Sequence, residues 1–172
     1  MKHLFLFLLT AGLSLMLSCK GDQGDQGLPG RDGVDGKDGN ANVKSYTKRV
    51  EANQWEIVGT LGSSIVIPTN IITQDIVDQG MVAVYFKDDV VGEWIAWPYT
   101  VTLPPPINIT SSYLYVVQLG QVELINYRSD LSPSGQSGFV RIVAISADGK
   151  VQNPDLDWND FHAVEKRFNL YE

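Results

Sequence analysis

Short alternating or fully apolar runs dominate the chain from residue 43 onward and predict β-strands. Val43 to Val50 alternates apolar and polar positions, whereas Met81 to Lys87 is apolar on both faces, as in a strand covered on both sides. The expected strands are 43–50, 55–60, 64–68, 81–87, 93–99, 113–119, 122–127 and 139–146. This spacing predicts an all-β fold, an antiparallel β-sandwich over residues 43–172.

Turn-forming residues separate these runs. We expect turns at Leu61-Gly62-Ser63 and Asp148-Gly149, and a hairpin around Gly120-Gln121. Pro104-Pro105-Pro106 is rigid and extended, and we expect it to carry the chain from one half of the sandwich to the other.

Two segments have a helical pattern. Thr73 to Val77 predicts one helical turn that ends near Gly80. Asp160 to Asn169 predicts a short C-terminal α-helix, with Asp157 or Asn159 as its N-cap. Its apolar positions form one stripe, which we expect to pack on the sandwich as a lid, with His162 on the surface. The stripe consists of Phe161, Val164 and Phe168.

The N-terminus has the pattern of a signal peptide. Lys2 and His3 precede an apolar run, Leu4 to Leu17, which is shorter than the roughly 20 residues that span a bilayer. Cys19 closes the run, so we expect a lipoprotein signal peptide over 1–18 and lipidation of Cys19. An ordinary secretory signal with an incidental cysteine, or an uncleaved anchor, is the alternative.

A collagen-like repeat follows Cys19. Glycine stands at every third position from Gly21 to Gly39, the period that a triple helix requires at its crowded axis. Pro29 is the one proline among residues 19–42, which favours an extended linker over a triple helix. A homotrimer formed through these triplets remains the alternative.

Several features together resemble the collagen-like lipoproteins of the Bacteroidetes group. They are Cys19, the glycine triplets, Gly39-Asn40-Ala41-Asn42-Val43, Val82-Ala83-Val84-Tyr85 and Phe168-Asn169-Leu170. The resemblance implies a lipid anchor in the outer membrane. In lipoproteins an aspartate directly after the cysteine marks retention in the inner membrane, and this chain has Lys20 at that position. We expect the protein to face the cell surface, with the periplasm as the alternative. The group implies no enzymatic activity.

Charge and reactive side chains exclude several functions. The chain has a formal net charge of −7, and residues 43–172 carry nine basic and fifteen acidic residues, which argues against nucleic acid as a partner. With one cysteine and, after position 3, one histidine, His162, the chain offers no metal-ligand cluster. It also has no Gly-x-Ser-x-Gly elbow. We therefore expect no catalytic site, cofactor or metal.

Aromatic residues are the remaining candidates for binding. Trp94, Trp97 and Tyr99 lie on one expected strand, with Trp97 and Tyr99 on one face and Trp94 on the other. Exposed rings stack on sugars or anchor protein partners. The alternative, that they fill the core, is favoured because large aromatic side chains are mostly buried.

These patterns support two hypotheses for function. In the first, a lipid anchor and a stalk present a β-sandwich head that binds a glycan or a protein outside the cell. In the second, the protein is a structural envelope component, trimerised through the stalk and without a ligand.

Overall fold

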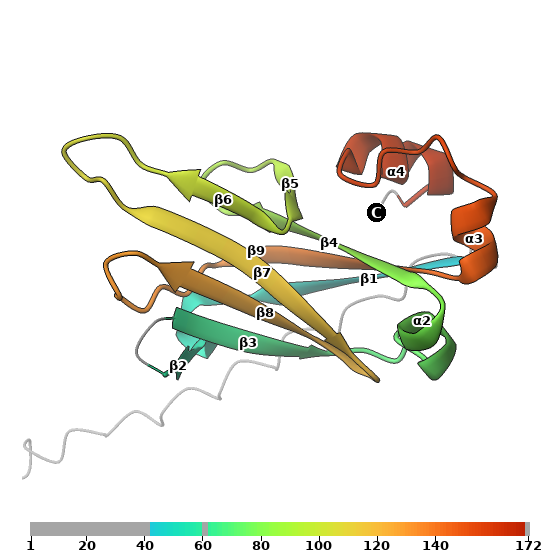
Figure 1. Ribbon diagram of the computed structural model, residues 1–172, viewed down its shortest axis with the longest axis horizontal. Coiled ribbons are helices and arrows are strands. Elements are labelled where there is room, and N and C mark those ends of the chain that lie inside the picture. Colours follow the sequence, from blue (N-terminus) through green and yellow to red (C-terminus); the bar gives the residue numbers. More distant parts are fainter. Residues whose placement is uncertain (1–41, 60–61, 171–172) are drawn as a thin grey trace, which may run out of the picture. The chain divides into compact units, whose positions relative to one another are not determined.

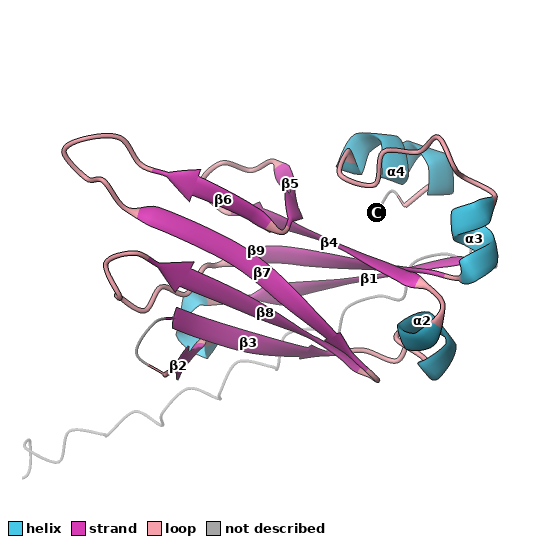
Figure 2. Ribbon diagram, viewed as in Figure 1, coloured by secondary structure: helices cyan, strands magenta, loops and turns pink. Residues whose placement is uncertain are grey.

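The computed structural model describes residues 42–59 and 62–170, which form two antiparallel sheets and three short α-helices (Figures 1 and 2). Sheet A has the order β1-β9-β4-β5, and sheet B has the order β2-β3-β8-β7-β6. Sheet A contains β1 (Val43–Val50), β4 (Met81–Asp88), β5 (Trp94–Trp97) and β9 (Gly138–Ile145). Sheet B contains β2 (Glu56–Val58), β3 (Gly62–Pro68), β6 (Tyr99–Thr102), β7 (Thr110–Gln118) and β8 (Gln121–Arg128). The helical elements are η2 (Ala52–Gln54), α2 (Gln74–Asp78), α3 (Ala147–Val151) and α4 (Phe161–Phe168).

The expected all-β sandwich with a C-terminal helix is confirmed, whereas the signal peptide, Cys19 and the collagen-like triplets lie outside the described residues.

Pro98 divides one expected strand into two. The run 93–99 forms β5, which pairs with β4 in sheet A, and β6, which pairs with β7 in sheet B. Proline has no N–H to donate to a ladder, so the strand ends there and the chain changes sheets. The described residues therefore hold nine strands rather than the expected eight.

The expectation for the three prolines is wrong. Pro104-Pro105-Pro106 lies in the loop between β6 and β7, and both strands belong to sheet B. The loop is closed by a hydrogen bond from Leu103 N to Ile109 O and one from Ile107 N to Pro104 O. The nearby change from sheet A to sheet B takes place at Pro98, between β5 and β6.

Two expected turns are also wrong, and the hairpin is shifted by one residue. β3 begins at Gly62, and Asp148-Gly149 lies inside α3, whose N-cap Ser146 accepts a hydrogen bond from Gly149 N. The β7–β8 hairpin exists, but Gln118 pairs with Gln121, so the turn is Leu119-Gly120. Gly120 has a φ of 76°, a conformation that glycine adopts without strain.

The main core lies between the two sheets. It is built from the inward-facing side chains of both sheets, together with Trp55 and the segment that leads to α2. Its fully buried members include Ile67, Ile72, Val84, Val122, Leu124, Val140 and Ile142.

A second core lies on the outer face of sheet A, where α4 packs as a lid. Phe161, Val164 and Phe168 are all buried there, as the stripe predicted. They contact side chains of β1, β4 and β9, which explains why Met81 to Lys87 is apolar on both faces. The N-cap is Asp160, whose side chain accepts from Ala163 N, rather than Asp157 or Asn159.

Candidate functional site

The three aromatic residues singled out in the sequence do not form one surface. Trp97 is 3% exposed and lies in the inter-sheet core, where its ring centroid is 5.6 Å from that of Phe86 and 5.2 Å from that of Tyr113. Tyr99 is half-buried on the same side and stacks on Tyr113 at 4.6 Å. Burial raises the pKa of Tyr99.

Trp94 faces the opposite side of sheet A. Its ring lies 4.9 Å from that of Phe161 in α4, and the guanidinium of Arg141 lies 5.0 Å above it. Arg141 also donates hydrogen bonds to Thr47 Oγ1 and to the carbonyl oxygen of Leu170. Trp94 thus helps to hold the lid, and all three rings fill cores.

An exposed platform of rings is absent from the described residues. The most exposed aromatic ring there is Phe139, at 37%, and the guanidinium of Arg49 lies 5.1 Å above it. Since sugar binding by stacking needs exposed rings, this arrangement offers little to a glycan.

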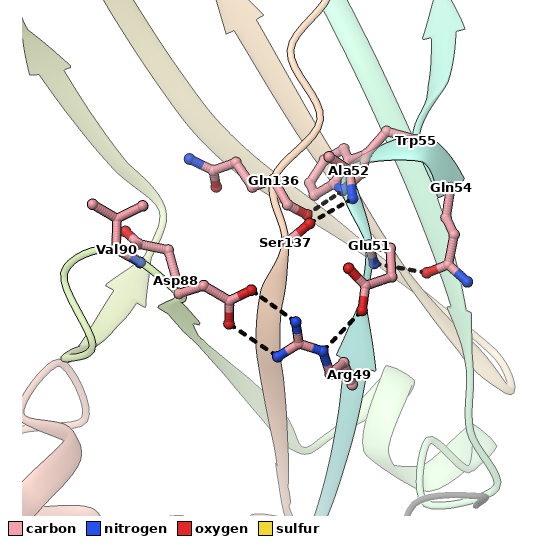
Figure 3. Close-up of polar contacts among 10 residues, drawn as sticks. Arg49, Glu51, Ala52, Gln54, Trp55, Asp88, Val90, Gln136 and Ser137 are labelled. Carbon is pink, nitrogen blue, oxygen red and sulfur yellow. Dashed lines mark hydrogen bonds and ion pairs between the residues drawn. The ribbon is translucent and has the colours of Figure 1, made fainter. Parts of the chain in front are cut away.

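The polar cluster around Arg49 joins segments that are distant in the sequence (Figure 3). Arg49 donates two hydrogen bonds to the carboxylate of Asp89, of 2.9 and 2.7 Å, and one of 2.8 Å to Glu51. These hydrogen bonds raise the pKa of Arg49. Nearby, Trp55 Nε1 donates to the carbonyl oxygen of Gln136. The cluster ties the end of β1 to the β4–β5 turn and to the loop before β9, and two carboxylates share its one guanidinium.

Metal-ligating side chains do not gather in residues 42–59 and 62–170. They contain no group of three or more His, Cys, Asp or Glu side chains able to hold a metal ion. His162 is 71% exposed, and its one ion-pair neighbour is Glu165 at 3.7 Å. A cleft of about 270 Å³ is lined by Lys48, Gln54, Glu56, Ser64, Ile65 and Val66.

Membrane insertion by a helix is likewise unsupported in this part of the chain. No helix among the described residues is long and apolar enough to span a bilayer.

The outer face of sheet B carries exposed aliphatic side chains. Alternation in β3, β7 and β8 sends Ile65, Tyr113 and Leu124 inward and their neighbours outward. Val66 is 45%, Leu114 39% and Val116 42% exposed. The same alternation turns Ser64, Ser112, Gln118 and Gln121 outward as well. We give the name sheet-B face to the largely aliphatic centre of this surface, Val66, Leu114, Val116, Glu123, Ile125 and Tyr127.

Register places these side chains in cross-strand rows. Glu123 pairs with Val66 on one side and with Val116 on the other, and Ile125 pairs with Leu114. The sheet-B face therefore has an aliphatic surface with one carboxylate at its middle.

No basic residue belongs to the sheet-B face. In the five strands of sheet B the one basic residue is Arg128, which pairs with Asp130 through hydrogen bonds of 3.1 and 2.9 Å. That pairing, with help from Ser132, holds the pKa of Asp130 well below its usual range. The sheet-B face is thus apolar and mildly acidic.

Sequence reasoning missed the sheet-B face, although a signal was present. Leu114-Tyr115-Val116-Val117 is apolar at four successive positions, which indicates a strand with apolar side chains on both faces. In β4 the same pattern is explained by the lid, whereas in β7 nothing in the described chain covers the second face.

Comparison with known proteins does not assign the chain. No family model matches it, and no curated protein or solved structure matches it either. Any functional conclusion therefore rests on the residues and the geometry.

Proposed function

We propose that this chain is a non-enzymatic, lipid-anchored protein of the outer membrane that faces the cell surface. Cys19 carries the lipid, the collagen-like triplets act as a stalk, and the β-sandwich head binds another protein through the sheet-B face. One observation carries this proposal: the chain covers the outer face of sheet A with its own helix α4 and leaves aliphatic side chains exposed on the outer face of sheet B.

Exposed side-chain type favours a protein over a glycan. Val66, Leu114 and Val116 are aliphatic, and aliphatic patches are typical of protein interfaces. The rings that would stack on sugars, Trp94 and Trp97, are engaged in the two cores.

The glycine triplets favour a second candidate, a structural envelope protein without a ligand. Three chains joined through the triplets would hold three heads together. A collagen circular-dichroism signal and a trimeric mass for the mature chain would support this candidate, and a monomer without that signal would exclude it.

Anchoring is tested by Cys19→Ala in the full-length chain. We expect the variant to leave the membrane fraction or to keep its signal peptide. Unchanged membrane association with normal processing would overturn the lipid anchor.

Binding is tested by capture of surface proteins from the producing cells on the immobilised mature chain. We expect one protein to be retained by the wild type and lost with Val66→Glu, which adds a charge to the sheet-B face. Val151→Glu is the matched control, because Val151 is 77% exposed on α3 and lies outside the sheet-B face. Equal capture by the wild type and Val66→Glu, or no specific capture by the wild type, would contradict the proposal.

A further inference from the structure

β7 has an unpaired half at the edge of sheet B. Its first half, Thr110 to Tyr113, pairs with β6. The pairing stops at Tyr113 because its partner Tyr99 is the first residue of β6, and the residues before Pro98 belong to sheet A. Beyond Tyr113, no strand of the described part pairs with this side of β7, so Leu114 to Gln118 forms a free edge of five residues.

The outermost strands in the described residues have features that discourage pairing with a further strand. β1 carries Lys44, Lys48 and Arg49, and lysine on an edge strand discourages pairing. β2 has three residues, β5 and β6 have four each, and β6 lies between Pro98 and Pro104. Short strands also leave Ile65 to Ile67 of β3 and Met81 to Ala83 of β4 without a neighbour, but each of these stretches has three residues. Short edges and flanking prolines serve the same purpose.

The free half of β7 has none of these protections. Leu114-Tyr115-Val116-Val117-Gln118 contains no charge, proline or glycine, and it is rich in residues that favour strands. Leu114 and Val116 are exposed on the outer side, while Tyr115 is held on the inner side by its hydrogen bond to Val82 O, of 2.9 Å.

We propose that Leu114 to Gln118 pairs antiparallel with the same segment of a second copy of this chain. A two-fold axis at Val116 would set Val116 opposite Val116, Tyr115 opposite Val117, and Leu114 opposite Gln118. A two-fold interface requires each residue to tolerate its own image. An uncharged segment meets this condition, because no like charges face each other across the axis.

The two copies would share one continuous sheet. Five residue pairs bury less than the roughly 1,200–2,000 Å² of a standard interface, so pairing depends on a raised local concentration. A common membrane anchor supplies that concentration. Pairing would place two sheet-B faces side by side, and it stands whether or not the sheet-B face has another partner.

Cross-linking in the membranes of producing cells tests this pairing with the full-length chain. We expect Val116→Cys to give a covalent dimer with a short bis-maleimide. Val66→Cys is the matched control, because Val66 has a similar exposure and lies in the same row, on the other side of Glu123. The wild type, whose one cysteine is Cys19, sets the background. A dimer from Val116→Cys alone supports the pairing, and equal yields or no dimer overturn it.

A distance measurement provides an independent test. A spin label at Val66→Cys should give one inter-chain distance of roughly 24 Å, five strand spacings of about 4.8 Å each. Adding Val116→Lys sets two lysines opposite each other and should abolish this distance, whereas Val116→Thr should keep it. A distance that persists with Val116→Lys, or none in the parent, would refute the pairing.

Discussion

The hydroxyl of Tyr85 on β4 donates a hydrogen bond of 2.6 Å to the carbonyl oxygen of Trp158, in the segment before α4. The ring of Tyr85 also meets that of Phe161 edge-on at 5.0 Å. Tyr85 is fully buried, so one side chain joins the middle of sheet A to the lid both by packing and by a hydrogen bond.

Tyr85→Phe keeps the ring and removes the hydrogen bond. We expect a loss of about 1–3 kcal/mol in the free energy of unfolding, because a partly buried carbonyl loses its donor. Urea denaturation at neutral pH measures this loss. A variant as stable as the wild type would show that solvent replaces the bond.

The same substitution, Tyr85→Phe, should change how the free energy of unfolding depends on pH above about pH 10. Burial raises the pKa of Tyr85 above the value near 10 of an unfolded chain. The neutral phenol therefore contributes stability that is complete below about pH 10 and is lost as the pH rises through the folded-state pKa. Tyr85→Phe should flatten the fall in stability above pH 10, and an unchanged slope would exclude this residue as its source.

Phe168→Ala tests the lid. Phe168 is 3% exposed and stacks on Trp158 at 5.6 Å, so its loss should cost about 3–5 kcal/mol. His162→Ala on the same helix is the control, because His162 is 71% exposed and its removal should change stability by less than about 0.5 kcal/mol. Thermal unfolding of both variants decides it: an unchanged midpoint for Phe168→Ala would contradict the lid.

Asp130→Asn tests the pairing with Arg128. The pKa of Asp130 is lowered, so the pair contributes stability that is present above about pH 4 and lost as the pH falls through the folded-state pKa. The stability difference between wild type and Asp130→Asn should therefore shrink from pH 6 to pH 2. Denaturant titrations across this range measure it, with the exposed Asp155→Asn as a control. A difference that does not depend on pH would rule out the pairing as its cause.

Gly138→Ala tests the close packing where β9 begins between β1 and β4. A Cβ at this position would lie 2.3 Å from the carbonyl oxygen of Lys87, which is backbone and cannot turn away. We expect a loss of about 1–3 kcal/mol, as for other overpacked sites, measured by urea denaturation. Lys150→Ala, at an exposed site, should be nearly silent. Equal stability of the two variants would show that β9 shifts freely.

Much of the fold follows from local patterns in the sequence. Strands β1, β4, β8 and β9 lie within one or two residues of their predicted bounds, because alternation and β-branched residues act over a few neighbouring positions. The lid was also predictable: three apolar side chains on one face of about two helical turns need a surface to bury them, and a helix this short is unstable alone.

What local patterns leave open is which surfaces meet. Trp94 and Trp97 stand three positions apart on β5, and the sequence shows that they face opposite sides. Only the tertiary structure shows that both sides are covered, one by sheet B and the other by α4. For this reason the candidate ligand contacts are core residues.

Local patterns also do not show that the chain changes from sheet A to sheet B at Pro98, or that the second half of β7 is unpaired. Pro98 and Pro104 both end a strand, and each lacks a donor in the same way, so the sequence cannot tell which one marks the change of sheet. Residues 43–172 thus determined by themselves a set of strands and a C-terminal amphipathic helix. The pairing of distant strands decided that Leu114 to Gln118 is left without a neighbour, because strand order depends on contacts between residues far apart in the chain.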